Sequence, residues 1–299
     1  MTNRELLSHF NLTGLPFSKE VAVENLIGLP SVEKAFQSAQ LLIETRGIGL
    51  MIGKSGTGKS CILRKLVESL HTGLYRPIYI CHTSIGLTEF YTHICVGLGL
   101  EPSARRAPMF RNIQQRILSL NKSNRVHPVL LIDETHHLDN EILKEIRLLT
   151  NFQIDSYNAL TVLLCGLEHI SSRFGLSSLE PLANSITITI HVESLPKEES
   201  FSYIEQRISN CGNSNSLFTK NALALIHQAS GGIMRNINTI AHAALVNAYM
   251  KKSIQVEAEH VKAVIERHID DCVKHHQQGI GNISVNKLTG RAKIWGGKC

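Results

Sequence analysis

The sequence contains no apolar run that approaches the ~18 to 20 residues of a membrane-spanning helix. Its opening stretch, MTNRELLSHFNLTGL, also lacks the basic segment followed by an apolar stretch that is typical of a secretory signal. These two absences predict a cytoplasmic protein without a membrane span.

Cysteine pairing patterns are missing as well. The seven cysteines are an odd number and show no CxxC spacing, which gives no support to a disulfide framework. Several lie in apolar, strand-like stretches such as TVLLCG, so we expect buried, reduced thiols at Cys61, Cys81, Cys95, Cys165, Cys211, Cys272 and Cys299.

The charge balance is moderate. The formal net charge of +6 favours a polyanionic partner without establishing one, because most basic surfaces are simply solvated. A length of 299 residues with 43% hydrophobic content describes an ordinary globular protein of one or two domains.

Short apolar runs punctuate the first two thirds of the chain and alternate with helical patterns. Continuous apolar runs of this length are typical of strands buried on both faces, so the pattern predicts a parallel sheet covered by helices. The last run alternates Thr with Ile, which suits an edge strand. The expected strands are 48–52, 77–80, 129–133, 160–165 and 186–192.

Strand signals vanish after Pro196, and apolar residues then recur every three or four positions. This pattern predicts a small helical domain with helices at 197–210, 218–229, 232–250 and 257–268. From about residue 270 the pattern dissolves, and we expect a flexible, mildly basic tail.

The stretch GKSGTGKS matches the phosphate-binding pattern G-x-x-x-x-G-K-[ST], and it lies between a predicted strand and a predicted helix. Its backbone N–H groups would point at the phosphates, Lys59 would meet the β and γ oxygens, and the Ser60 hydroxyl would ligate Mg²⁺. The competing interpretation is an ordinary glycine turn. The expected nucleotide-binding residues are Gly53, Lys54, Ser55, Gly56, Thr57, Gly58, Lys59, Ser60 and Cys61.

A second motif, VLLIDETHHL, ends an apolar strand on Asp133 and Glu134. Asp133 would hold Mg²⁺ through water, and Glu134 would polarise the water that attacks the γ-phosphate. The competing interpretation makes Asp133 a helix N-cap. Together the two motifs predict ATP and Mg²⁺ as ligands.

Longer stretches carry a family resemblance: SHFNLTGLPFS, GKSGTGKS, LLIDETHHLDNEILKEIRLLTNF, VLLCGLEHI and SGGIMRNIN. Over roughly residues 5–268, in this order, the chain resembles an AAA+ ATPase of the ExeA group, which includes the TniB and TnsC type transposition ATPases. The resemblance implies an α/β fold with a five-stranded parallel sheet flanked by helices and a small helical lid. It implies an N-terminal segment packed on the ATPase core (1–45), the core (46–195), the lid (196–269) and the tail (270–299).

The resemblance also assigns roles in the lid and the N-terminal segment. Arg235 falls where such proteins have the sensor 2 arginine, which reaches the γ-phosphate, and an arginine at the start of a lid helix can move with the lid. Phe10, Pro16 and Phe17 fall in the segment that packs near the adenine, although they could equally anchor the first strand.

The chain departs from the family pattern at three places. His136 stands where relatives have a glutamine. Cys165, Gly166 and Leu167 occupy the sensor 1 position, so Glu168 or Thr161 would have to serve there.

The trans-acting arginine of relatives is replaced by Asn184 and Ser185, and Arg173 is the nearest substitute. Because a missing finger can cost ~10³-fold or more in rate, the sequence predicts slow hydrolysis.

Two further constellations fall near the C-terminus. His268, Cys272, His275 and His276 could be a metal site, although a solvated helix end is favoured because no second ligand pair follows. Trp295 could stack on a base or seal a partner groove, although a disordered tail end is favoured.

Three functions fit these features. The first is a transposition ATPase that assembles as a homo-oligomer on double-stranded DNA in the ATP state and recruits or activates a transposase; the basic balance, the short length and the lack of a membrane span favour it. The second is an ExeA-like ATPase that energises a secretion or pilus assembly system through a protein partner. The third, a replication loader, shares the same ATP chemistry.

Overall fold

The computed structural model describes residues 2–18, 28–81, 85–213 and 215–267. The chain divides into two units: Pro30–Glu193, and Met1–Leu29 together with Ser194–Cys299. The predicted tail and the constellations at His268, Cys272, His275, His276 and Trp295 lie outside the described residues.

The five predicted strands are confirmed and form one parallel sheet in the order β2-β3-β4-β1-β5. β5 alternates exposed with partly buried residues and lies at an edge, as predicted. By contrast, every residue of β1, β3 and β4 is buried, which explains why these strands are almost entirely apolar. The bounds are β1 Ile48–Ile52, β2 Tyr75–Ile80, β3 His127–Ile132, β4 Thr161–Gly166 and β5 Ile186–His191.

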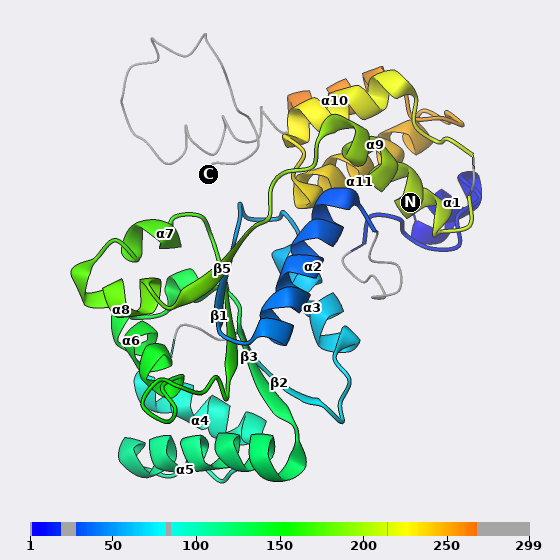
Figure 1. The fold of residues 1–299 in the computed structure, drawn as a ribbon. Helices are drawn as coiled ribbons and strands as arrows, with labels where there is room; N and C mark the ends of the chain where they lie inside the picture. The colour runs from blue at the N-terminus through cyan, green and yellow to red at the C-terminus, as the bar shows by residue number, and fades with distance from the viewer. Residues whose placement is uncertain (1, 19–27, 82–84, 214, 268–299) are drawn as a thin grey trace. The chain divides into compact units, whose positions relative to one another are not determined.

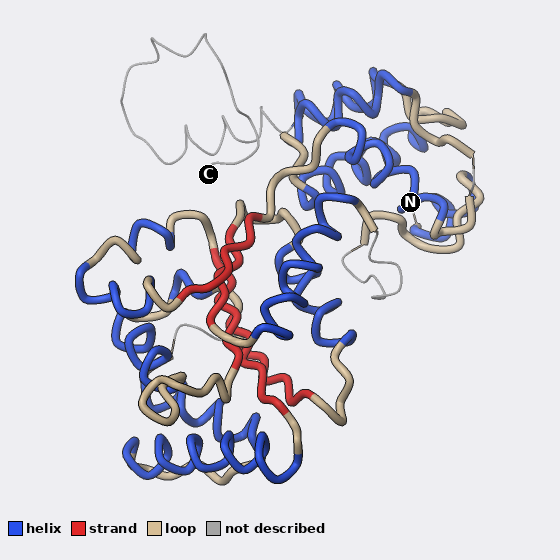
Figure 2. Tube along the Cα trace, in the orientation of Figure 1, coloured by secondary structure: helices blue, strands red, loops and turns tan. Residues whose placement is uncertain are grey.

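Helices cover both faces of the sheet, so this unit has three layers: helices, sheet and helices. The ribbon and the tube show them in the same orientation (Figures 1 and 2). Successive residues of β3 supply the two cores: Val129 and Leu131 pack with α2 and α3, and Leu130 and Ile132 pack with α4, α5 and α6. The helices are α2 Pro30–Thr45, α3 Lys59–Ser69, α4 Leu87–Leu98, α5 Arg106–Ser119 and α6 Asn140–Leu149.

Short helical turns connect the longer elements of this unit. One of them, η3, immediately follows β3 and carries two histidines. The turns are η2 Leu120–Asn124, η3 Thr135–His137, α7 Ile170–Arg173, η4 Ser177–Leu179 and α8 Glu180–Ala183.

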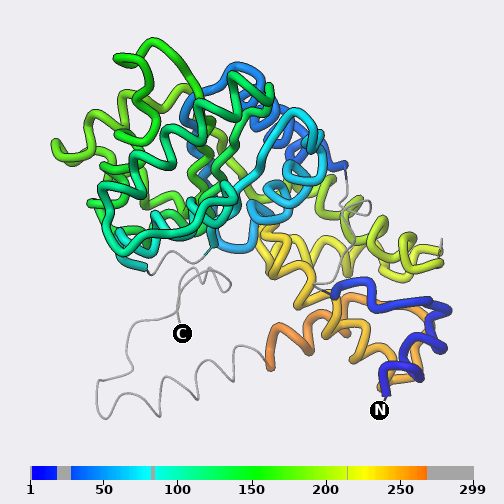
Figure 3. The backbone as a smooth tube through the Cα atoms, turned by 90° about the horizontal axis from the view of Figure 1, so that it is seen from below, coloured from blue at the N-terminus to red at the C-terminus, as the bar shows by residue number. Residues whose placement is uncertain are grey.

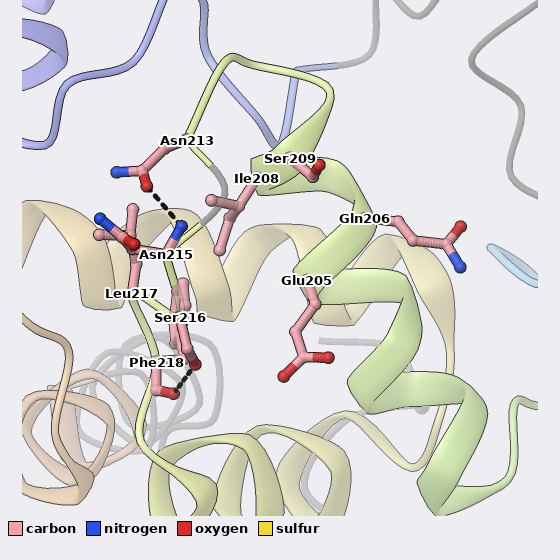
Figure 4. A pocket seen from close by; sticks show the side chains of 9 residues that line it. All are labelled: Glu205, Gln206, Ile208, Ser209, Asn213, Asn215, Ser216, Leu217 and Phe218. Carbon is pink, nitrogen blue, oxygen red and sulfur yellow. Dashed lines mark hydrogen bonds between the residues drawn. The ribbon is translucent and has the colours of Figure 1, made fainter.

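The second unit is helical, as the pattern after Pro196 predicts. Its helices are α1 Asn3–His9, α9 Lys197–Ser209, α10 Lys220–Ser230 and α11 Met234–Met250, and residues 258–267 are also helical. A pocket is lined by residues of α9 together with residue 213 and residues 215–218; within its lining Asn215 N donates to Asn213 Oδ1 at 2.8 Å and Ser216 Oγ donates to the Phe218 carbonyl at 2.9 Å (Figure 4).

The N-terminal segment, residues 1–45, divides between the two units. Residues Met1–Leu29 belong to the helical unit, and within residues 1–45 the helix that packs on the sheet is α2. Asn213 Nδ2 donates to the Phe10 carbonyl at 2.7 Å, and Arg207 Nε donates to the Pro16 carbonyl at 2.5 Å. Figure 3 shows the N-terminal trace beside the last helices of this unit. These hydrogen bonds join residues about two hundred positions apart, so no local sequence pattern predicts them.

The aromatic residues of this segment are core residues of the helical unit. Phe10 is 2% exposed and Phe17 is 7% exposed. The Phe17 ring meets the Phe218 ring edge to face at 6.1 Å between centroids. An anchoring role therefore fits both side chains, with the helices rather than the first strand as the surface they hold.

The described cysteines are free thiols, and only Cys95 and Cys165 are buried. Cys61 and Cys211 are half-buried and Cys81 is exposed, so the expectation of burial is wrong for these three. Among the described residues, we find no helix with the length and apolar character needed to cross a membrane.

Candidate nucleotide site

The phosphate loop joins the end of β1 to the start of α3, as the motif requires. A Cβ on Gly53 would lie 2.2 Å from the Val192 carbonyl oxygen, so only glycine fits there. Gly58 has a φ of 98°, a left-handed conformation that favours glycine. An ordinary glycine turn before a helix does not require both the close approach at Gly53 and the left-handed backbone at Gly58.

We expect Gly53→Ala to lower the free energy of unfolding of the Pro30–Glu193 unit by about 2–3 kcal/mol, because the loop or the strand end must shift. Gly86→Ala is the matched control, since a Cβ there meets nothing within 4 Å, and it should cost under about 1 kcal/mol. Urea denaturation of both variants measures the difference. Equal destabilisation would contradict the steric argument.

Lys59 is 7% exposed and bends back over the loop. Its ammonium group donates to the Gly53 carbonyl at 2.8 Å and to the Lys54 carbonyl at 2.7 Å. A buried cation is thus held at the centre of the loop, where phosphate oxygens would compete with the two carbonyls as acceptors.

Ser60 and Asp133 come together although they are 73 residues apart in sequence. The Ser60 hydroxyl donates to Asp133 Oδ2 at 2.8 Å, and Asp133 is 4% exposed. Parallel strands end at the same edge of the sheet, which brings the end of β3 beside the start of α3. The pair offers one hydroxyl and one carboxylate oxygen at a single point.

Tyr79 is a site residue that sequence reasoning missed. Its hydroxyl donates to the same Oδ2 of Asp133 at 3.1 Å. Burial, and then the Asp133 charge, raise the pKa of Tyr79, so the phenol stays protonated and keeps donating. The signal lies in the pairing of β2 with β3, which sets Tyr79 opposite Leu131 and cannot be read from YRPIYI alone.

Glu134 follows Asp133 with a left-handed backbone, φ 51°, which turns its side chain out of the strand. The side chain is 48% exposed, and the Glu134 N–H donates to Asp133 Oδ1 at 2.9 Å. The N-cap alternative for Asp133 is wrong, because the turn η3 begins after Glu134 and no side chain caps it. An exposed carboxylate beside a buried one fits the predicted division between base and metal ligand.

Buried neutral groups surround this corner of the site. Burial, and then the neighbouring His137, lower the pKa of His136 to about 4, so the imidazole is neutral at pH 7. Burial, and then the Asp133 carboxylate, raise the pKa of the Cys165 thiol well above its usual value. His136 and Cys165 are therefore two uncharged groups close to the Asp133 carboxylate.

Arg173 is held within its own unit. Its guanidinium donates to the His136 carbonyl at 3.0 Å, to the Leu138 carbonyl at 2.7 Å and to Asn140 Oδ1 at 2.5 Å. These bonds tie α7 to the segment that follows β3. They give Arg173 a structural function, which a finger reaching another subunit would have to give up.

We expect Arg173→Ala to lower the free energy of unfolding by about 2 kcal/mol, because three backbone and side-chain acceptors lose a charged donor. Arg105→Ala, at an exposed arginine outside the site, is the control and should change it by under about 0.5 kcal/mol. Chemical denaturation measures both. Unchanged stability with a ~10³-fold slower ATPase would instead support the finger.

The sensor 1 candidates separate in space. Thr161 begins β4, at the opposite end of the strand from Gly166, and its hydroxyl pairs with His127 Nε2 at 2.9 Å. Because the phosphate loop lies at the carboxyl ends of the strands, Thr161 cannot serve as this sensor. Glu168 is exposed in the turn after β4 and is left as the candidate.

The remaining predicted site residues are Arg235, in α11, and the other residues of the phosphate loop. Arg235 is exposed in the first turn of α11, in the helical unit, and its sensor 2 function stays a prediction. Within the loop, Thr57 is 1% exposed and its hydroxyl donates to the Lys54 carbonyl at 2.9 Å. The other members are exposed or half-buried: Lys54, Ser55, Gly56, Gly58, Ser60 and Cys61.

Comparison with known proteins agrees with this geometry. Residues 42–174 match the family model described as AAA domain. The chain is 31% identical over 212 residues to general secretion pathway protein A of Aeromonas hydrophila, an alignment that covers 70% of this chain and 38% of that protein. The chain thus spans well under half the length of this relative.

Two solved structures show the same arrangement. Cdc6p from Pyrobaculum aerophilum superposes with a TM-score of 0.67 at 18% identity, over 84% of this chain and 70% of its own. The Drosophila ORC bound to DNA gives 0.62 at 17% identity, over 90% of this chain and 68% of its own. At these identities the structures establish the fold alone.

Proposed function

The chain has the AAA+ P-loop ATPase fold, and from this premise we propose that it binds ATP with Mg²⁺ and hydrolyses it slowly as a nucleotide-controlled switch. One observation carries the proposal. Ser60 Oγ donates to Asp133 Oδ2 at 2.8 Å, and the adjacent residue Lys59 holds its ammonium against the loop carbonyls, which supports a joint metal and phosphate site at this edge of the sheet.

The residues fit Mg²⁺. A serine hydroxyl and a carboxylate are hard oxygen donors of the kind that Mg²⁺ prefers, usually with waters completing its shell. Ser60 and Asp133 would hold the ion, and Tyr79 would orient the carboxylate through its hydrogen bond. When bound, the ion would neutralise charge on the β and γ phosphates.

Glu134 supplies the base in this scheme. Its exposed carboxylate can accept a proton from the water that attacks the γ-phosphate, while the buried Asp133 stays with Ser60. Lys59 would stabilise charge on the phosphate oxygens. Slow turnover follows from the tethering of Arg173 and from Asn184 and Ser185 at the finger position, since a finger contributes ~10³-fold or more.

The direct test is the rate of phosphate release from ATP by the full chain with Mg²⁺ and with excess EDTA. We expect turnover that depends on Mg²⁺ and lies well below the ~1–10³ s⁻¹ typical of enzymes. Mass measurement with and without nucleotide tests the proposed homo-oligomer, since sites of this fold are completed between subunits. A Mg²⁺-independent rate would contradict the proposal.

For the partner, the 31% identity to general secretion pathway protein A favours the ExeA-like alternative. We therefore propose that the ATP state acts on a protein partner of a secretion or pilus assembly system. The alignment covers only 38% of that relative, so the partner is proposed and does not follow from the alignment.

A second candidate is assembly on double-stranded DNA, with a transposase as the recruited partner. The net charge of +6 favours it, as does the likeness in fold to the Drosophila ORC, which was solved bound to DNA. The relatives named above include no transposition protein. A replication loader would share the DNA behaviour and differ only in its partner.

Retention of the full chain on duplex DNA, with and without ATP across a salt series, separates the two candidates. DNA assembly predicts ATP-dependent retention that falls steeply as salt rises, because phosphate contacts release counterions. No retention at low salt would exclude it and leave the protein partner.

A further inference from the structure

The turn after β3 gathers more metal-binding side chains than the proposed Mg²⁺ site uses. Glu134, His136 and His137 each offer a ligand atom, and these atoms all lie within 4.8 Å of one another. Glu134 Oε2 and His136 Nδ1 are 3.4 Å apart. We propose that these three residues form a second cation site, selective for a borderline-soft ion such as Zn²⁺, and that its occupancy blocks hydrolysis.

The local backbone creates the cluster. Thr135–His137 is a 3₁₀ turn closed by a hydrogen bond from His137 N to the Glu134 carbonyl at 2.9 Å. In such a turn the side chains at i and i+3 lie one above the other, which places His137 over Glu134. The Arg173 guanidinium donates to the His136 carbonyl at 3.0 Å and fixes the turn from outside.

An unpartnered nitrogen provides the second, independent observation. The His136 side chain is 6% exposed, yet its Nδ1 makes no hydrogen bond with any described residue. His136 Nδ1 lies 3.4 Å from Glu134 Oε2, but the two atoms do not have the geometry of a hydrogen bond. A buried polar atom without a partner is uncommon and calls for an explanation, and a cation between Nδ1 and the carboxylate supplies one.

The distances suit Zn²⁺. Bonds of ~2.0–2.2 Å in a tetrahedral site put ligand atoms about 3.3 Å apart, which the Glu134–His136 pair already matches. His137 is exposed and can rotate to close the remaining separation. Two imidazoles and one carboxylate, with a fourth position left to water, match Zn²⁺ chemistry and are poor ligands for Mg²⁺.

The inhibitory consequence rests on the proposed function, because it needs Glu134 as the base. A carboxylate bound to Zn²⁺ cannot accept the proton from the attacking water, so ATP would stay bound and uncleaved. Binding of the metal itself does not depend on that assignment.

The test uses the full chain without nucleotide and Co²⁺ as a spectroscopic probe, followed by displacement with Zn²⁺. We expect tetrahedral d–d absorption bands in the unsubstituted protein. His137→Gln should weaken Co²⁺ affinity about 100-fold, and His71→Gln, at an exposed histidine of the same unit, should leave it unchanged. Since His137 is exposed, its replacement does not threaten folding. Equal Co²⁺ affinity and spectra in the unsubstituted protein and His137→Gln overturn the site.

The second measurement is ATP hydrolysis at fixed Mg²⁺ with added Zn²⁺. We expect at least a 10-fold fall in the unsubstituted protein, and a His137→Gln rate that stays near its own zinc-free value. Equal inhibition of both proteins overturns the inhibitory function, since Zn²⁺ would then act through the nucleotide. Co²⁺ binding without any ATPase activity would contradict the proposed function and support the cation site. ATPase activity without Co²⁺ binding would support the proposed function and contradict the cation site.

Discussion

Glu134→Gln is expected to stop ATP turnover while leaving ATP binding intact. The amide keeps the size of the side chain and cannot accept a proton from water, so the rate should fall about 10²- to 10⁴-fold. The ligands that hold the nucleotide and metal, Lys59, Ser60 and Asp133, are unchanged. Phosphate release gives the rate, and titration with a fluorescent ATP analogue gives the affinity.

Glu141→Gln is the matched control, because it changes an exposed glutamate of α6 in the same unit. It should hydrolyse ATP at the unsubstituted rate. Normal hydrolysis by Glu134→Gln would show that the assignment of the base is wrong.

Lys59→Ala is expected to lose ATP binding as well as turnover. The ammonium is buried and central to the loop, and removing such a charge from phosphate oxygens costs about 2–4 kcal/mol, or about 30- to 1,000-fold in affinity. Lys59→Met should show the same loss while keeping the aliphatic stem that packs in the loop. Equilibrium titration with ATP measures both variants.

The same ammonium also bridges the Gly53 and Lys54 carbonyls, so stability must be measured beside affinity. Lys34→Ala, at an exposed position of α2, should change neither quantity. ATP affinity within threefold of the unsubstituted protein in a folded Lys59→Met would contradict the phosphate contact.

The sheet was largely predictable from sequence. A strand buried on both faces is mostly apolar, and the runs IGLMI and VLLI are recognisable in the sequence for that reason. The approach of Ser60 to Asp133 was predictable too, because both follow strand ends in one parallel sheet.

The contacts that were missed depend on pairing between distant segments. Tyr79 reaches Asp133 only because of the β2–β3 register. Arg207 holds the Pro16 carbonyl across 191 positions, so the docking of the N-terminal segment on the helices has no local signature. Arg173 is similar, since its acceptors are two backbone carbonyls and Asn140, and carbonyls are common to every residue.

The fit of Gly53 against Val192 has a mechanical consequence. Val192 N donates to the Ile52 carbonyl at 2.7 Å, and the Val192 carbonyl leaves no room for a Cβ on Gly53. Val192 lies two residues before Ser194, where the chain passes into the helical unit. We expect any movement of the loop on phosphate binding to displace Val192 first, and with it the residues that lead along the chain into the helical unit.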